Sequence, residues 1–316
     1  MRKRFIVIFL LATALIIFTT VAMVYGQEAK YPTKPIAVVY HSEAGSGGDI
    51  FLRNLAKVVK KVFDQPMVVE NRTGAGGANA WIYVANADPD GYTLLGISSK
   101  IVSAPLQTEM PVDYTDFKPI AQVFFDPEVI YVRTDSKYKT FQDIIDDAKA
   151  RPGQQNWGSG SPGSAETLCM MKIAQIAGID INLIPFESGP DVMVNVLGGR
   201  IDAAIGEYGE IASPVEAGEI KIIANLNTER MPDLPDVPTL TEGGVDFVFE
   251  KIRGLMAPKD TPDEIVQIWV DLIKNVYDDP DFTKYYTANH IYPLFRPTNE
   301  MQKALDAQRA FFKEMM

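Results

Sequence analysis

A short apolar strand that runs into a glycine-rich loop and then into a helix constrains this chain most. Residues 36–40 (IAVVY) are predicted to form a buried strand, and residues 42–48 (SEAGSGG) form the loop. Beyond the loop, apolar residues recur at helical spacing from Leu52 to Val59, so a helix is predicted to begin at Asp49. The free N–H groups of such a helix start, together with the helix dipole, suit an anion or a polar group. A tight turn that binds nothing is the alternative, because glycine is the default residue of any sharp turn.

Strands and helices alternate along the chain that follows. A second strand (67–69) leads into a second glycine-rich turn (70–77), and a third strand (92–98) follows a turn at residues 88–91. This alternation of short apolar strands with helices predicts an α/β fold with mostly parallel sheets flanked by helices. Ligands of such sheets bind beyond the carboxyl ends of the strands, where these loops lie.

The second half repeats the arrangement of the first. Thr140 and Asp143 resemble a capping box at the start of a helix. The loop at residues 159–164 (SGSPGS) then precedes a helix predicted over Ala165–Ala177. Its small residues, hydroxyl groups and free N–H groups repeat the design of the first loop.

The chain is long enough to form two lobes. We expect residues 27–125 and 226–316 to form lobe 1 and residues 126–225 to form lobe 2. The chain would cross between the lobes at Asp126-Pro127-Glu128, between two separate strands, and return after a strand at residues 220–224. Two such crossings provide a hinge between the lobes.

Residues 1–26 have the pattern of a secretory signal peptide, with a basic start at Arg2-Lys3-Arg4, an apolar stretch and smaller residues before Gln27. The apolar stretch is long enough to span a bilayer, so an uncleaved anchor is the alternative. Both interpretations predict a periplasmic location. The single cysteine, Cys169, cannot form an intramolecular disulfide and is expected to be a small buried hydrophobic residue.

The formal net charge of −11 argues against nucleic acid or anionic membranes as partners. The chain has two histidines, His41 and His290, and neither has the spacing of a metal ligand. No nucleophile elbow, P-loop or dinucleotide fingerprint occurs. We therefore predict a monomeric binding protein without a cofactor or a metal, rather than an enzyme.

Several longer motifs agree in order, spacing and identity with those of one protein family. The most specific is QPMVVENRTGAGG at residues 65–77, and others are DGYTLL at 90–95, LGGRID at 197–202 and LPDVPTLTEGG at 234–244. From Tyr31 to the C-terminus the chain resembles the periplasmic solute-binding receptors of tripartite tricarboxylate transporters. The resemblance implies a two-lobed periplasmic-binding-protein fold that closes around a ligand, usually an organic carboxylate. It also implies that the ligand is delivered to membrane transporter subunits.

The resemblance and the loop composition indicate the same two loops as the binding site. In the first loop the expected ligand-binding residues are Ser42, Glu43, Ala44, Gly45, Ser46, Gly47, Gly48 and Asp49. In the second loop they are Ser159, Gly160, Ser161, Gly163 and Ser164. Glu187 and Glu207 are expected to face the same cleft.

Three glutamates among these residues, Glu43, Glu187 and Glu207, are acids in a cleft expected to bind an anion. Each would repel a solvated carboxylate by about 1 kcal/mol. The acids could point to solvent, accept hydrogen bonds from a hydroxyl or amine of the ligand, or include one protonated group. We hypothesise a small polar solute that carries a donor group as well as, or instead of, a carboxylate. A sensory receptor for a signalling partner and an exported enzyme on the same scaffold are the alternative functions.

Overall fold

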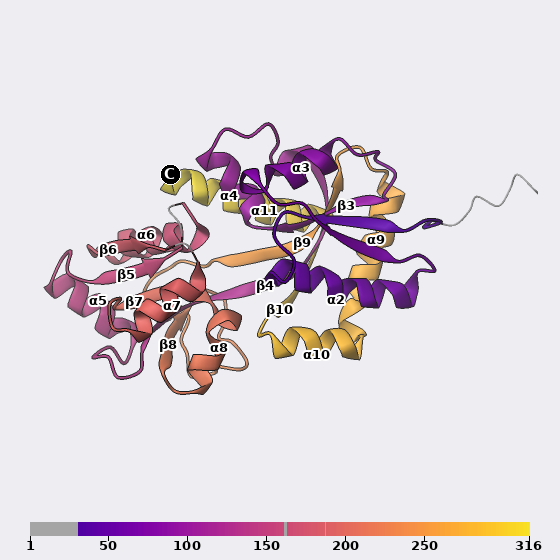
Figure 1. The fold of residues 1–316 in the computed structure, drawn as a ribbon. Helices are drawn as coiled ribbons and strands as arrows, with labels where there is room; N and C mark the ends of the chain where they lie inside the picture. Colours follow the sequence, from indigo (N-terminus) through magenta and orange to yellow (C-terminus); the bar gives the residue numbers. More distant parts are fainter. Residues whose placement is uncertain (1–30, 161–162, 187) are drawn as a thin grey trace, which may run out of the picture.

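The computed structural model describes residues 31–160, 163–186 and 188–316 (Figure 1). The predicted signal peptide lies outside the described residues, as do the predicted site residues Ser161 and Glu187. Within the described ranges no helix has both the length and the apolar character needed to cross a membrane.

Lobe 1 begins with the strands and helices that the apolar runs predict. They are β1 (Ile36–Tyr40), α2 (Gly47–Val62), β2 (Met67–Asn71), η1 (Ala75–Gly77), α3 (Ala78–Ala85), β3 (Thr93–Ser98), α4 (Lys100–Gln107) and η2 (Tyr114–Asp116). β1 lies between β2 and β3 and pairs with both in parallel. Leu52, Leu55 and Val59 form the buried face of α2, because their spacing keeps them on one side of the helix.

The long strand β4 (Phe117–Arg133) runs through both lobes. It pairs antiparallel with β9 (Glu250–Pro258), β10 (Tyr292–Pro297), β7 (Ala203–Glu207) and β8 (Ile220–Asn225). The predicted interruption at Asp126-Pro127-Glu128 is therefore wrong, because Pro127 stays in register with Glu250 of β9. The predicted boundary between the lobes falls inside β4, and Figure 1 shows β4 and β9 joining the two groups of helices.

Lobe 2 contains the strands β5 (Asn156–Ser159), β6 (Asn182–Pro185), β7 and β8 and the helices α5 (Phe141–Ala150), α6 (Ala165–Ala177), α7 (Gly189–Leu197) and α8 (Tyr208–Glu216). β5 pairs in parallel with β6 and β7. The capping box that Thr140 and Asp143 predicted is present at the start of α5. The predicted α/β fold is confirmed, but the strands are not mostly parallel as expected: β4 and β9 add antiparallel pairs to the parallel ones, so the sheet is mixed.

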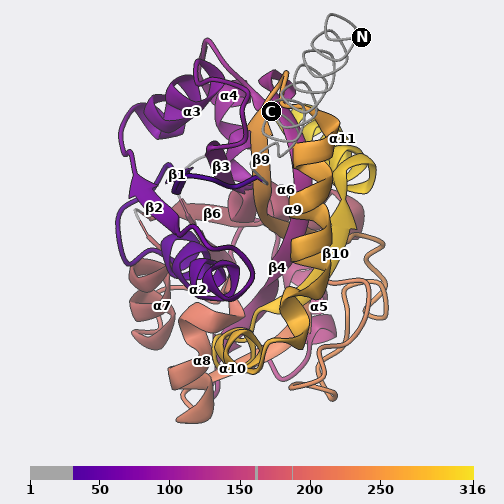
Figure 2. The same ribbon diagram turned by 90° about the vertical axis from the view of Figure 1, so that its right-hand side faces the viewer.

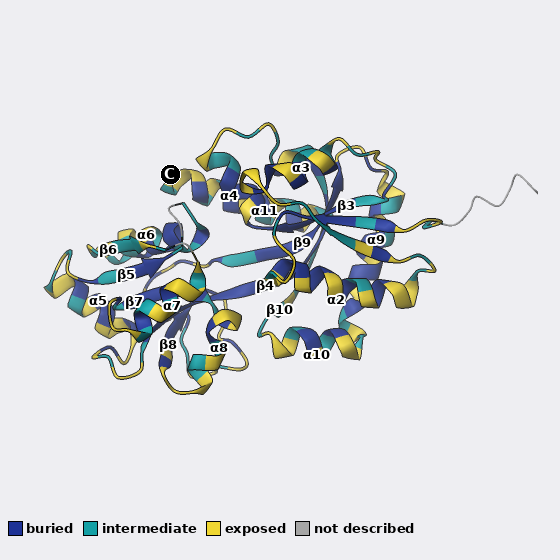
Figure 3. Ribbon diagram, in the orientation of Figure 1, coloured by how far each residue is buried: buried dark blue, intermediate teal, exposed yellow. Residues whose placement is uncertain are grey.

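The C-terminal part of the chain returns to lobe 1 with α9 (Asp263–Asn275), η3 (Val276–Asp278), α10 (Pro280–Ala288) and α11 (Thr298–Met315). Helices α3, α4 and α11 contribute to one hydrophobic cluster and α2, α9 and α10 to another, so the two sets cover opposite faces of the sheet. Figure 2 shows α3 and α4 above the strands and α2 and α10 below them. Burial follows this arrangement, and the exposed residues lie on the outer surfaces of the helices and in the connecting loops (Figure 3).

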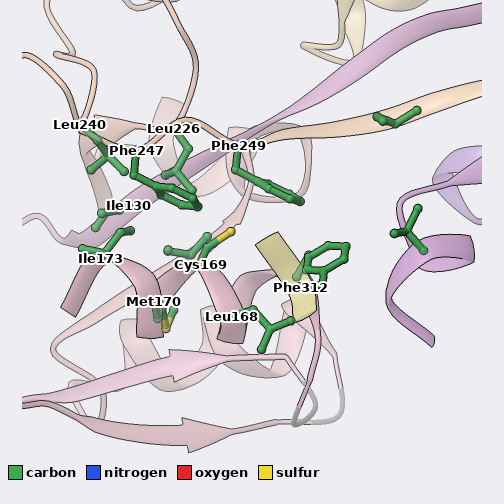
Figure 4. Close-up of a cluster of buried hydrophobic side chains, with 14 of the residues drawn as sticks. Ile130, Leu168, Cys169, Met170, Ile173, Leu226, Leu240, Phe247, Phe249 and Phe312 are labelled. Carbon is green, nitrogen blue, oxygen red and sulfur yellow. The ribbon is translucent and has the colours of Figure 1, made fainter. Parts of the chain in front are cut away.

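The first hydrophobic cluster continues from lobe 1 into lobe 2. Phe312 of α11 belongs to the same cluster as Leu168 and Cys169 of α6 and Phe249, which directly precedes β9 (Figure 4). Cys169 is fully buried, as predicted. Since α11 packs against α6, the last helix of the chain ties the two lobes together on this side of the crossing strands.

Candidate functional site

A cavity of about 510 Å³ lies between the two lobes. Its lobe 1 wall is formed by the end of β1, the start of α2 and the helix α4, and its lobe 2 wall by the start of α6. The crossing strand β9 contributes the floor, through Lys251 and Arg253. The cavity thus lies beyond the carboxyl ends of β1 and β3, where ligands of α/β sheets commonly bind.

The first predicted loop contributes part of its residues to this cavity. Ser42, Ser46, Gly47 and Gly48 line it. Gly48 has to be a glycine, because a Cβ there would lie 2.0 Å from the hydroxyl oxygen of Tyr40. The N-cap residue Ser46 makes no side-chain cap hydrogen bond, so the first N–H groups of α2 are left to the cavity.

The other residues of the first loop lie outside the cavity lining. Glu43, Ala44 and Gly45 are exposed. Asp49 is buried, and its carboxylate accepts hydrogen bonds from the Gly45 N–H at 2.8 Å and from Arg53 Nε at 2.9 Å. Asp49 therefore shapes the loop.

The second predicted loop contributes Ser164, whose Oγ caps α6 by accepting a hydrogen bond from the Thr167 N–H. Ser159 lies buried beneath the loop, and Gly160 and Gly163 are outside the lining. The carbonyl oxygen of Gly163 accepts a hydrogen bond from Nε2 of Gln107 in α4. This contact joins the two lobes beside the cavity.

A cluster of charged side chains forms the floor of the cavity. Lys251 Nζ lies 2.8 Å from Glu166 Oε1, 2.5 Å from Glu207 Oε1 and 3.3 Å from Glu128 Oε1. These three carboxylates each place an oxygen within 4.8 Å of the others, an arrangement that could hold a metal ion. The Lys251 ammonium contacts all three and supplies the positive charge that a metal would bring.

The acids of this cluster differ in their ionisation. Burial raises the pKa of Glu128 well above its ordinary value, since its side chain is fully buried and makes no hydrogen bond within the described residues. Burial acts in the same direction on Glu166, but Lys251 outweighs it and lowers the pKa of Glu166 to about 2. The pKa of Glu207 is also lowered, against its burial, by Lys251 and Arg253. Glu166 and Glu207 are thus ionised near neutral pH, and Glu128 is the member of the cluster that holds a proton most readily.

His41 forms part of the cavity wall between Tyr40 and Trp81, whose ring centroids lie 4.5 Å and 5.9 Å from that of the imidazole. Burial lowers the pKa of His41 to about 3, and the nearby Lys100 and Arg253 act in the same direction. The imidazole is therefore neutral near pH 7 and offers one donor and one acceptor.

Sequence reasoning missed several residues of the cavity. Lys251 and Arg253 are two residues apart, so they lie on the same face of a strand, and this alternation was the available signal. Ser99 and Lys100 follow the carboxyl end of β3, the same position in the sheet that made the first loop a candidate. Glu207 was expected at the cleft and lines the cavity, but its pairing with Lys251 could not be anticipated.

Comparison with known proteins bears on the identity of the chain. Residues 51–314 match the family model TctC, described as the tripartite tricarboxylate transporter family receptor. A UPF0065 protein of Agrobacterium vitis is 32% identical over 285 residues, which cover 89% of this chain and 80% of the relative. Protein BugT of Bordetella pertussis is 32% identical over 241 residues, covering 75% of this chain and 74% of the relative.

Solved structures agree with these relatives. A TctC solute-binding protein from Polaromonas superposes with a TM-score of 0.82 at 27% identity, over 90% of this chain and 98% of that one. A protein from R. palustris, whose structure contains adipate, superposes with a TM-score of 0.76 at 25% identity, over 90% of this chain and 97% of that one. The chain therefore belongs to the TctC family of tripartite tricarboxylate transporter receptors, which are solute-binding proteins and not enzymes.

Proposed function

We propose that this protein captures a small organic acid in the cavity between its lobes and delivers it to the membrane subunits of a tripartite tricarboxylate transporter. It would do so in the periplasm, as a monomer exported through the signal peptide at residues 1–26. From the two predicted loops, the proposed binding residues are the ones that line the cavity: Ser42, Ser46, Gly47, Gly48 and Ser164. Glu207, Lys100, Glu166, Lys251 and Arg253 complete the proposed set.

The lining of the cavity is the observation that carries this proposal. Three helices, α2, α4 and α6, begin at its wall, and helix starts favour anionic groups. Lys100, Lys251 and Arg253 face two acids, Glu166 and Glu207, so cations exceed acids in the lining. The adipate-containing relative from R. palustris supports an organic carboxylate as the ligand.

The acids that conflicted with an anionic ligand fit this proposal. Glu43 is exposed, and Glu207 is paired with Lys251 and Arg253, so neither brings a free negative charge into the cavity. The carboxylate oxygens of Glu166 and Glu207 can still accept hydrogen bonds from a hydroxyl or an amine. We therefore keep both features in the proposed ligand, a carboxylate and a donor group.

Binding works by closure of the two lobes. The ligand shifts the population toward the closed form because it binds the closed form more tightly than the open form, and the difference between the two affinities sets the size of the shift. Ser164 and Glu166 from lobe 2 and Gly47 and Gly48 from lobe 1 would contact the ligand together only when the lobes are closed.

Isothermal titration calorimetry with a panel of dicarboxylates, hydroxy acids, amino acids and polyols tests the proposal. We expect an acid that carries a hydroxyl or amine to bind most tightly. Binding of polyols alone would refute the organic acid, and binding of plain dicarboxylates alone would refute the donor group. Mass spectrometry of a solute that co-purifies with the protein gives an independent identification.

A further inference from the structure

The guanidinium of Arg253 is buried at the cavity, and one of its three nitrogens makes no hydrogen bond to a described residue. The Arg253 side chain is only 9% exposed, and two of its three guanidinium nitrogens have hydrogen-bond partners. Nε donates to Asp126 Oδ2 at 2.5 Å, and Nη1 donates to the Tyr40 hydroxyl at 2.9 Å. Within the described part of the chain Nη2 donates no hydrogen bond, and it forms an ion pair with Glu207 Oε2 at 3.7 Å.

The free Nη2 lies beside a glycine at the start of α2. A Cβ at Gly47 would lie 3.4 Å from Nη2, so the absence of a side chain there keeps this nitrogen open to the cavity. The N–H groups of Gly47 and Gly48 belong to the first turn of α2, which has no side-chain cap. A buried guanidinium and a helix start therefore converge on one corner of the cavity.

The other cations of the cavity do not offer the same contact. Lys251 Nζ donates a hydrogen bond to Glu166 and also forms ion pairs with Glu128 and Glu207, so its charge is neutralised within the protein. Lys100 is exposed and stays hydrated. Arg253 is the lining cation that combines burial with an open donor.

We propose that Arg253 is the charged anchor of the solute, through a hydrogen bond from Nη2 to a ligand carboxylate that also accepts from the amides of Gly47 and Gly48. This inference rests on the proposed function. Arginine suits the role because it stays charged and presents a fixed fork of donors to a carboxylate. Glu207 Oε2 competes with the ligand for Nη2, and this competition limits the affinity.

The position of Arg253 also determines the class of solute. Arg253, Gly47 and Glu207 border a second cavity of about 230 Å³ as well, so the anchor lies where the two cavities meet. A solute must then place an ionised carboxylate at this junction, where its two oxygens can accept from Nη2 and from the amides of Gly47 and Gly48. An amide of the same shape offers one uncharged acceptor oxygen and turns its NH2 donors toward these N–H groups, so acids are selected over their amides.

Calorimetry with matched acids and amides tests this assignment. The probes are succinate, malate and adipate, each compared with its diamide, on the wild-type protein and on two variants. Gly47→Val covers Nη2 at an exposed helix start, where the backbone conformation tolerates a side chain. Asp126→Asn combined with Arg253→Gln removes the guanidinium without leaving Asp126 as a buried unpaired charge.

A matched control pair exists elsewhere in lobe 1. Arg309 also pairs with an aspartate, Asp113 at 3.0 Å, and lies over a tyrosine ring, that of Tyr114. Asp113→Asn combined with Arg309→Gln therefore repeats the chemical change away from the cavity. Thermal unfolding of all variants shows whether each one is folded.

We expect the wild-type protein to bind the best acid at least 100-fold more tightly than its diamide. Both cavity variants should lose at least tenfold in acid affinity, and the control pair less than twofold. Equal affinity of the wild type for acid and diamide, or unchanged acid affinity in a folded cavity variant, would overturn the role of Arg253 and leave the proposed function standing. Failure of every acid to bind the wild type would overturn both.

Discussion

Replacement of Lys251 by methionine should be among the most destabilising changes on the floor of the cavity. Lys251 Nζ contacts acid oxygens at 2.5, 2.8 and 3.3 Å, and its side chain is only 18% exposed. Methionine keeps most of the volume of the stem but leaves the carboxylates without their cation. Removing one partner of a buried ion pair costs about 3–5 kcal/mol of unfolding free energy.

The repulsion between the remaining acids gives a similar value. Glu166 and Glu207 are both ionised in the wild type, and their oxygens lie within 4.8 Å of each other. At an effective dielectric constant of about 20, two unit charges at this distance repel by about 3 kcal/mol. We therefore expect Lys251→Met to lower the unfolding free energy by about 3–5 kcal/mol at pH 7.

Lys61 provides a matched control on the surface. Its Nζ also contacts two carboxylates, Asp279 at 2.7 Å and Asp281 at 2.8 Å, but its side chain is 48% exposed. Exposed pairs contribute about 0–1 kcal/mol, so Lys61→Met should cost no more than that. The two lysines thus make similar contacts and differ in burial.

Urea unfolding followed by circular dichroism and tryptophan fluorescence measures both variants against the wild type. The deficit of Lys251→Met should shrink as the pH falls toward 5, because protonation of the acids relieves their repulsion. If Lys251→Met costs no more than Lys61→Met, burial does not set the strength of this cluster and the reasoning is wrong.

Three further predictions follow from other contacts. Burial raises the pKa of Glu128, so the folded protein keeps a proton that the unfolded chain loses above the ordinary pKa of glutamate. The wild-type unfolding free energy should therefore fall with rising pH, by up to about 1.4 kcal/mol per pH unit. Glu128→Gln should flatten this slope in urea unfolding measured from about pH 4 to 8. Gln107→Ala removes the hydrogen bond to Gly163 between the lobes, which contributes about 1 kcal/mol, and should weaken ligand affinity about fivefold. It should also increase the radius of gyration of the ligand-free protein in X-ray scattering, and an unchanged radius would contradict this. Phe312→Ala should cost about 3–5 kcal/mol by cavity formation in the cluster that joins the lobes, measured by urea unfolding, and a cost below 1 kcal/mol would show that the cluster does not join them.

Much of the fold could be predicted because its signals are local. The helix predicted over Ala165–Ala177 has these bounds in the structure, since Ser164 caps its start and Gly178 ends it in a left-handed conformation. The capping box of Thr140 was likewise visible, because its two partners are three residues apart. The strand–loop–helix unit at β1 and α2 followed from apolar spacing and glycine content.

The centre of the site could not be predicted, because its partners are distant in the sequence. Asp126 and Glu128, on either side of Pro127, had the composition of a turn. Their place in a continuous strand depends on Lys251 and Arg253, which lie more than 120 residues further along the chain and neutralise them. A charged segment is compatible with a buried strand only when the opposite charges are known to lie beside it.

The charges of the crossing strands also determine which contacts can drive closure. Arg253 lies on β9 beside Tyr40 and Gly47 of lobe 1, so a carboxylate bound there would meet these groups in the open and the closed form alike. A ligand shifts the equilibrium only through contacts that differ between the two forms. Those contacts must come from lobe 2, where the start of α6 brings Ser164 to the cavity. Arg253 would thus determine the affinity of the open form for the acid. The contacts at the start of α6 would determine how far binding shifts the equilibrium toward the closed form.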